Sequence, residues 1–261
     1  MSGVLAQIIA QKALEIAALR GRSAAPPASP RGAEVSTRLR RLSREPMRLV
    51  TEIKRRSPSA GALSSALSVS ERARAYAANG AAMISVLADE KFFDGGWSYV
   101  AETRAAAGDD ALVLAKEFVL DERQIDEAAA AGADAVLLIV RIVDAETLHR
   151  LVDHARAVGL EPLVEIVDER ELEAALAAGS KVIGVNARDL DTLQMDAARA
   201  ERVLAQIPAE CVKLHLSGLR NPADVAEIAR KNVDAALIGE ALMRIDDPAP
   251  LLRAMCAATL G

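Results

Sequence analysis

One unit recurs along this sequence: a short apolar run, a longer stretch with helical periodicity, and a glycine. The helical stretches are rich in alanine, glutamate and arginine, and four of them end near Gly80, Gly132, Gly159 and Gly179. Glycine is the preferred residue where a chain leaves a helix in the left-handed conformation and turns back into a strand. Strands that alternate with helices form a parallel sheet, because each return to the same edge needs a crossover. The pattern therefore predicts an α/β fold.

The apolar runs number eight, and each has the length of one buried strand. They cover residues 49–54, 82–87, 111–116, 135–139, 162–166, 182–186, 212–217 and 235–239. Eight βα units in roughly 210 residues predict a (β/α)8 TIM barrel. The alternative is an open, doubly wound sheet, which commonly carries a glycine-rich fingerprint after its first strand. The sequence after residue 54 has no such fingerprint, so the barrel is favoured.

Residues 1–45 precede the first strand and predict a helical extension of the barrel. Residues 4–19 place Leu5, Ile8 and Ile16 at helical spacing, which indicates an amphipathic helix. Residues 21–32 are rich in proline, alanine and serine and predict a loop, and residues 35–42 predict a second short helix. We expect residues 1–261 to form a single domain.

Composition and charge exclude several classes of partner. The net charge of −5 argues against a nucleic-acid partner, and no apolar run approaches the length of a membrane span. Cys211 and Cys256 have no metal or redox spacing, and free thiols fit a reducing compartment. We therefore expect a cytoplasmic protein with no metal, no nucleic-acid partner and no membrane partner.

The first predicted strand carries two charges on the face where a core should lie. Glu52 and Lys54 are two positions apart and share a strand face with Val50. Placing two charges there costs free energy unless they pair with each other or take part in chemistry. This run alone leaves both interpretations open, a buried ion pair and a catalytic pair.

Polar residues also stand at the same end of the other predicted strands. In TIM barrels the working residues lie at the carboxyl ends of the strands and in the loops that follow them. A set of polar or small residues occupies these ends: Lys54, Lys116, Glu165, Asn186, Ser217 with Gly218, and Gly239 with Glu240. Their shared position predicts one active site at the barrel mouth.

The residue types at this end indicate acid–base chemistry on a phosphorylated molecule. Lys116 and Glu165 supply a proton donor and a proton acceptor on opposite sides of the mouth. Loops after the seventh and eighth strands commonly bind phosphate in this fold, and Gly218 and Gly239 let an anion approach the backbone closely. The residues predict an enzyme for a small phosphorylated substrate but do not name it.

At these residues the chain closely resembles the indole-3-glycerol phosphate synthase family, a family of phosphate-binding (β/α)8 barrels. The resemblance covers essentially the whole chain, including the N-terminal extension. Its longest matching motifs are residues 52–59, 85–87 with 89–93, 116–118, 136–139, 161–165, 184–190 and 238–243. The resemblance implies ring closure of 1-(2-carboxyphenylamino)-1-deoxyribulose 5-phosphate with loss of CO₂ and water, as one step of tryptophan biosynthesis, without a cofactor.

The resemblance also implies a role for each matching residue. Lys116 corresponds to the general acid and Glu165 to the general base. The residues implied to orient the substrate and stabilise charge are Glu52, Lys54 and Asn186. Those implied around the phosphate are Lys54, Ser217, Gly218, Gly239 and Glu240, and those implied around the anthranilate ring and carboxylate are Ser57, Phe93, Leu138 and Arg188.

One departure from the pattern of the family bears directly on the chemistry. A glutamate usually precedes the Ser-Gly pair after the seventh strand, and here Leu216 takes its place. His215 should face the other way and therefore should not replace that carboxylate. We favour a working synthase with weakened activity, acting as a monomer or weak homodimer. The alternatives are a phosphoribosylanthranilate isomerase-like enzyme and a catalytically degenerate barrel that binds ligands.

Overall fold

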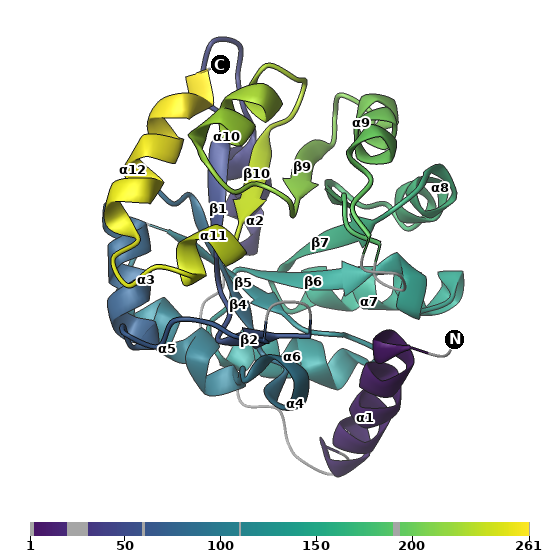
Figure 1. Ribbon diagram of the computed structural model, residues 1–261. Coiled ribbons are helices and arrows are strands. Elements are labelled where there is room, and N and C mark those ends of the chain that lie inside the picture. Colours follow the sequence, from purple (N-terminus) through teal and green to yellow (C-terminus); the bar gives the residue numbers. More distant parts are fainter. Residues whose placement is uncertain (1–2, 20–30, 59–60, 110, 190–193, 261) are drawn as a thin grey trace.

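The computed structural model describes residues 3–19, 31–58, 61–109, 111–189 and 194–260, and its centre is a closed barrel of parallel strands (Figure 1). The barrel strands are β1 (Arg48–Ile53), β4 (Met83–Leu87), β5 (Leu112–Lys116), β6 (Ala135–Ile139), β7 (Glu161–Ile166), β8 (Val182–Asn186), β9 (Val212–Leu216) and β10 (Ala235–Ile238). A two-stranded antiparallel hairpin of β2 (Arg56–Ser57) and β3 (Gly61–Ala62) follows β1.

Helices lie on the outside of the barrel and at its ends (Figure 1). They are α1 (Val4–Leu19), α2 (Gly32–Leu39), α3 (Val69–Ala78), α4 (Glu90–Phe93), α5 (Trp97–Ala107), α6 (Glu122–Ala130), α7 (Ala145–Ala157), α8 (Glu169–Ala177), α9 (Ala197–Gln206), α10 (Pro222–Ala229), α11 (Glu240–Met243) and α12 (Ala249–Ala257), with 3-10 turns at Val140–Ile142 and Ala258–Leu260. No helix among these described residues is long and apolar enough to cross a membrane.

The strand order confirms the predicted barrel. The order around the ring is β1-β10-β9-β8-β7-β6-β5-β4, and β1 pairs with both β10 and β4. This double pairing closes the sheet, so the open doubly wound alternative is wrong. Each of the eight apolar runs coincides with one barrel strand to within about two residues, which is the usual scatter of such boundaries.

The predicted helix ends are confirmed, but the second short helix is shifted. Gly80, Gly132, Gly159 and Gly179 all have positive φ, between 75° and 98°. Helix α2 begins at Gly32 and ends at Leu39, three residues earlier at both ends than predicted. Gly32 therefore belongs to a helix rather than to the predicted loop, and most of that loop lies outside the described residues.

Strand side chains alternate between two hydrophobic layers. One layer fills the barrel interior, and the other lies between the strands and the surrounding helices. In β6, for example, Leu137 and Ile139 belong to the interior layer, whereas Val136 and Leu138 belong to the outer one. This alternation decides which polar residues at the strand ends can reach the barrel mouth.

The N-terminal extension closes both ends of the barrel. Leu5 and Ile8 of α1 join the interior layer together with Phe118, which follows β5. Val35 and Leu39 of α2 join the same layer, and both are fully buried. Helix α1 therefore covers part of the mouth, whereas α2 closes the amino-terminal end, where the strands begin.

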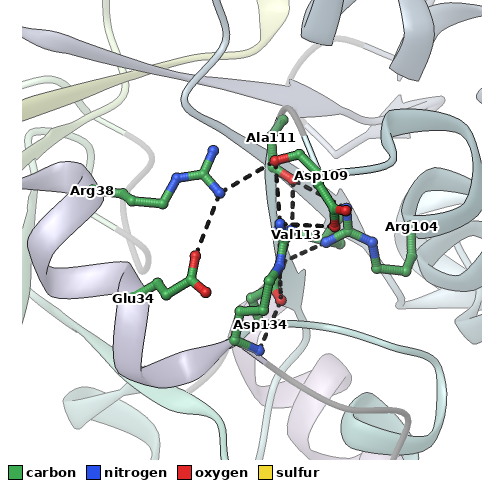
Figure 2. Close-up of polar contacts among 8 residues, drawn as sticks. Glu34, Arg38, Arg104, Asp109, Ala111, Val113 and Asp134 are labelled. Carbon is green, nitrogen blue, oxygen red and sulfur yellow. Dashed lines mark hydrogen bonds and ion pairs between the residues drawn. The ribbon is translucent and has the colours of Figure 1, made fainter.

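A buried aspartate before β6 holds the amino-terminal end of α2 (Figure 2). Asp134 is 1% exposed and accepts hydrogen bonds from the backbone N–H of Arg31 at 3.0 Å and of Val113 at 2.8 Å. The guanidinium groups of Arg31 and Arg104 also contact its carboxylate, at 3.2 and 2.8 Å. One carboxylate thus joins α2 to two neighbouring barrel strands and to α5.

A second aspartate performs the same task at the other end of α2. Asp234 precedes β10 and accepts hydrogen bonds from the backbone N–H of Arg41 at 2.9 Å and of Lys213 at 2.8 Å. The two aspartates occupy equivalent positions before their strands, so α2 is fixed from two sides of the barrel. Backbone N–H groups that would otherwise lose their partners on burial are satisfied in this way.

Replacing Asp134 should destabilise the barrel. We expect Asp134→Asn to lower the free energy of unfolding by about 3 kcal/mol, because it leaves two arginines without their buried counter-charge. Chemical denaturation measures this change. Asp109→Asn is the matched control, because Asp109 also pairs with Arg31 but its side chain is 97% exposed. Similar stabilities for the two variants would contradict this account of Asp134.

Candidate active site

A cavity of about 530 Å³ opens at the carboxyl ends of the barrel strands. That volume lies within the range of small-molecule sites. All but one of the site residues predicted from the sequence line this cavity. They are Glu52, Lys54, Ser57, Phe93, Lys116, Glu165, Asn186, Arg188, Ser217, Gly218, Gly239 and Glu240. The barrel therefore brings residues from distant parts of the chain to a single site.

The exception is Leu138, and its predicted place in the wall is wrong. Leu138 is 1% exposed and belongs to the outer hydrophobic layer, between the strands and the helices. Its neighbours Leu137 and Ile139 line the cavity instead. The error has a simple physical cause, because adjacent residues of a strand point to opposite faces.

Glu52 is the centre of a buried charge network. Its carboxylate accepts a hydrogen bond from Lys54 Nζ at 2.6 Å and another from Lys116 Nζ at 2.7 Å. Burial alone would raise the pKa of Glu52, but the two ammonium groups outweigh it and lower the pKa to about 2. Glu52 therefore stays ionised at neutral pH and holds both lysines in place.

Gly239 leaves the space that Glu52 occupies. A Cβ atom at this position would clash with the Glu52 carboxylate, so only glycine permits the approach of the chain after β10. The glycine that the sequence suggested for anion binding thus also has a packing role, which the sequence alone did not reveal.

Glu165 has the opposite electrostatic character. It is 2% exposed and accepts a hydrogen bond from Asn186 Nδ2 at 3.0 Å. Burial raises its pKa above the usual value, and this effect outweighs the opposing influence of Lys116 and Asn186. Two carboxylates in one cavity with pKa values moved apart are the arrangement that assigns an acid–base role.

Asn186 links Glu165 to the loop after β9. Its Oδ1 accepts hydrogen bonds from Ser217 Oγ at 2.8 Å and from the backbone N–H of Arg188 at 2.9 Å. Ser217 and Gly218 both have positive φ, at 73° and 94°, so the chain turns sharply at the end of β9. The side-chain amide fixes both the carboxylate and this turn.

Lys116 is held in its charged form. Burial would lower its pKa, but Glu52 and Glu165 outweigh this effect, and the pKa lies above the usual value for lysine. Its ammonium group lies between a carboxylate that remains ionised and one whose ionisation is disfavoured by burial. Lys116 therefore carries a proton close to a carboxylate whose pKa is raised by burial.

The apolar side of the cavity contains residues that the sequence analysis missed. The rings of Phe93 and Phe118 lie 5.8 Å apart, and Val4, Leu5 and Ile8 of α1 line the cavity near them. The apolar stripe of α1 was visible in the sequence, but its partner was not. Arg220 and Arg244 also line the cavity and were not predicted.

Comparison with known proteins identifies the family of the chain. The sequence model of the indole-3-glycerol phosphate synthase family matches residues 5–255. The chain belongs to the indole-3-glycerol phosphate synthase family. The predicted family is thereby confirmed, and with it an enzyme of the carbon–carbon lyase class and of tryptophan biosynthesis.

Curated relatives support the assignment over most of the chain. Indole-3-glycerol phosphate synthase 1 of Streptomyces coelicolor is 44% identical over 212 residues, which are 81% of this chain and 78% of the relative. The indole-3-glycerol phosphate synthase of Mycobacterium leprae is 39% identical over 250 residues, which are 95% of this chain and 89% of the relative.

Solved structures support the fold alone. A 3-hexulose-6-phosphate synthase has a TM-score of 0.65 at 19% identity, and the match covers 81% of this chain and 99% of that structure. Thiamine phosphate pyrophosphorylase from Pyrococcus furiosus has a TM-score of 0.64 at 16% identity, with 83% and 96% covered.

Leu216 stands where the resemblance led us to expect a glutamate. It is 3% exposed, lines the cavity and packs against Gly184, in the same interior layer as Leu163. His215 lies outside the described lining of the cavity, and burial lowers its pKa to about 4, so it is neutral at pH 7. The predicted orientations of the two side chains are therefore confirmed.

Within the part of the chain that the structure describes, no group of three or more His, Cys, Asp or Glu side chains is arranged to hold a metal ion. Glu52 and Glu165 of this synthase site accept hydrogen bonds from lysine and asparagine side chains.

Proposed function

We propose that Lys116 is the general acid and Glu165 the general base for the synthesis of indole-3-glycerol phosphate. The substrate is 1-(2-carboxyphenylamino)-1-deoxyribulose 5-phosphate. The observation that carries the proposal is the opposite pKa shift of Glu52 and Glu165 around one ammonium group. Glu52 keeps Lys116 protonated, whereas burial raises the pKa of Glu165 above its usual value, as suits a group that takes up and releases a proton during the reaction.

Ring closure begins with attack of the aromatic ring carbon on the ribulose carbonyl. The electrons of the carbonyl bond move to its oxygen, which takes a proton from Lys116. The carboxyl group then leaves as CO₂, and its bonding electrons restore the aromatic ring. Most of the rate enhancement for such a condensation comes from holding the two carbons in contact. A charged donor at the oxygen adds electrostatic stabilisation.

Dehydration completes the reaction. Lys116 first regains a proton from solvent. The hydroxyl group then leaves as water with this proton, and Glu165 removes a proton from the substrate as the new double bond forms. No electron is gained or lost by the protein in either step, so the proposed chemistry requires no redox cofactor. Asn186 keeps Glu165 oriented toward the cavity through its 3.0 Å hydrogen bond.

The substrate phosphate is proposed to bind on the side of Ser217, Gly218, Gly239 and Glu240. These residues line the cavity, and the glycines allow close approach of an anion to the backbone. Lys54, Arg220 and Arg244 also line the cavity and carry positive charge. The loops after the last two strands are the usual phosphate site of TIM barrels.

The anthranilate part is proposed to lie on the apolar side. Phe93 offers a ring face, Ser57 offers a hydroxyl, and Arg188 offers a cation for the carboxylate that is later lost as CO₂. The two ends of the substrate then place its carbonyl near the centre of the mouth, beside Lys116. We also propose that the protein works in the cytoplasm as a monomer or weak homodimer.

Introducing a carboxylate at position 216 should raise turnover. Leu216 lines the cavity beside Asn186, its partner in the β8–β9 register, and a glutamate there adds a negative charge to the mouth. We expect Leu216→Glu to increase kcat at some cost in stability, because the site is now packed with apolar groups. Leu216→Gln is the matched control, since it has the same shape without the charge. Equal kcat in the leucine and glutamate proteins, both folded, would contradict the prediction.

A two-substrate fluorescence assay tests the proposed function. With 1-(2-carboxyphenylamino)-1-deoxyribulose 5-phosphate, a synthase produces a rise in indole fluorescence. With phosphoribosylanthranilate alone, an isomerase consumes the substrate but forms no indole. We expect turnover only with the first substrate. Turnover of the second alone would support the isomerase alternative, and binding without turnover of either would support a degenerate barrel.

A further inference from the structure

A lysine of the N-terminal helix is buried among carboxylates beside the active site. Lys12 of α1 is 1% exposed. Its ammonium group lies 2.8 Å from a carboxylate oxygen of Glu15, 2.8 Å from one of Asp89 and 3.0 Å from one of Glu117. Glu15 belongs to the same helix, whereas the other two carboxylates follow β4 and β5. Lys12 therefore joins α1 to two loops of the barrel mouth.

Asp89 connects Lys12 to the apolar wall of the cavity. Its Oδ1 accepts hydrogen bonds from the backbone N–H of Phe92 at 2.6 Å and of Phe93 at 3.2 Å, and it caps the short helix α4. Its Oδ2 faces the Lys12 ammonium group. The position of the Phe93 ring is thus tied to the position of α1.

Glu117 connects Lys12 to the proposed general acid. It directly follows Lys116 and is 3% exposed. One oxygen accepts the Lys12 hydrogen bond, and the other accepts a 2.7 Å hydrogen bond from the backbone N–H of Phe118. A shift of Glu117 would therefore move both the backbone at Lys116 and the Phe118 ring.

This arrangement costs free energy that an apolar contact would not. A buried ion pair seldom stabilises a protein more than well-packed apolar groups do, but removing one partner leaves a buried charge uncompensated. Burial raises the pKa of Glu117 to about 7 despite the opposing influence of Lys12. Without Lys12, Asp89 and Glu117 would face each other with no cation between them.

We propose that Lys12 is a positioning residue for ring closure: it holds α1 across the mouth and, through Asp89 and Glu117, sets the positions of Phe93 and Lys116. The apolar residues Leu5 and Ile8 are brought to the cavity by the same anchor. The proposal rests on the function proposed above for Lys116 and the cavity. It adds that α1 is part of the working site and is fixed there by one charge.

Lys12→Met tests the proposal, with Lys181→Met as the control. Methionine keeps the length of the lysine stem without its charge, and Lys181 is exposed. We expect Lys12→Met to raise KM and to lower kcat/KM by roughly 10- to 100-fold, since small displacements of reacting groups have effects of this size. Amide hydrogen exchange in residues 4–19 should become faster. Lys181→Met should match the parent protein in every measurement.

The outcomes separate a positioning role from a merely structural one. The kcat and KM of Lys12→Met are to be measured well below the melting temperature of the variant. If both equal those of the parent protein, the proposal is overturned, whatever the rate of hydrogen exchange. If Lys12→Met does not fold, Glu117→Gln takes its place and should show the same loss of kcat/KM. Lys12→Arg keeps the charge and should recover part of the loss. Failure of the proposed function itself would show as absence of turnover in the parent protein, so the two are distinguishable.

Discussion

Replacing Lys116 with methionine should lower kcat about a thousandfold, which is within the usual contribution of a general acid. The Lys116 ammonium group is the only one that contacts Glu52 from across the barrel mouth in the described structure, at 2.7 Å. Methionine removes the proton that the carbonyl oxygen receives and the charge that stabilises it. KM should change much less, because the phosphate and aromatic ends of the cavity remain. Initial rates of indole formation measure both parameters.

A second variant at this position separates the charge from the proton. Lys116→Arg keeps a cation next to Glu52, but a guanidinium group does not give up its proton in proteins. We expect Lys116→Arg to remain severely impaired even where it folds as well as the parent protein. Activity of the arginine variant close to that of the parent would show that Lys116 acts through its charge alone and would contradict its role as proton donor.

Replacing Glu165 with glutamine should also abolish most activity, by about 100- to 10,000-fold in kcat. Burial raises the pKa of Glu165 above its usual value, so the carboxylate becomes an active base only as the pH rises through that raised pKa. The rate of the parent protein should therefore increase with pH on the acidic side. The residual activity of Glu165→Gln should not show this increase with pH.

The same shift has a consequence for stability. A carboxyl group with a raised pKa in the folded state stabilises the fold at low pH and loses that contribution as the pH rises through the folded-state pKa. Glutamine removes this dependence, so the stability of Glu165→Gln should fall less between acidic and neutral pH than that of the parent protein. Glu52 supplies the contrast: its pKa of about 2 places its own titration far below this range.

The activity measurement decides the assignment of the base. Identical pH profiles of activity in the parent and the Glu165→Gln protein would contradict that assignment.

Much of the barrel was predictable because its signals are local. The eight strands are short apolar runs followed by helices and glycines, and each run lies within about two residues of an observed strand. The mouth residues Lys116, Glu165 and Asn186 were also predictable, because all carboxyl ends of a parallel barrel meet on one face. The strands follow from the local pattern, and the mouth residues follow from the strands and their common direction.

Other features depend on contacts between distant parts of the chain. Leu138 was placed on the wrong face because a resemblance of motifs does not by itself state which residue of a strand points inward. The shift of α2 reflects Asp134 and Asp234, which bind the backbone at Arg31 and Arg41. No sequence pattern near α2 predicts these hydrogen-bond partners, because they lie about a hundred or more residues away in the chain.

The N-terminal helix shows the same limit in the active site. Its apolar stripe was visible in the sequence, but the burial of Lys12 between Asp89 and Glu117 was not. A lysine on an amphipathic helix ordinarily extends into solvent. Only the folded structure shows that this one faces the loops that carry Phe93 and Lys116.

The central claim is that one cavity holds the aromatic and phosphate ends of the substrate on opposite sides of Lys116. A crystal structure of the protein with indole-3-glycerol phosphate tests this most directly. The account predicts the phosphate beside Gly218 and Gly239, the indole ring against Phe93, and the Lys116 ammonium group close to the newly closed ring. A phosphate on the side of Phe93, or a product bound outside the barrel mouth, would contradict it.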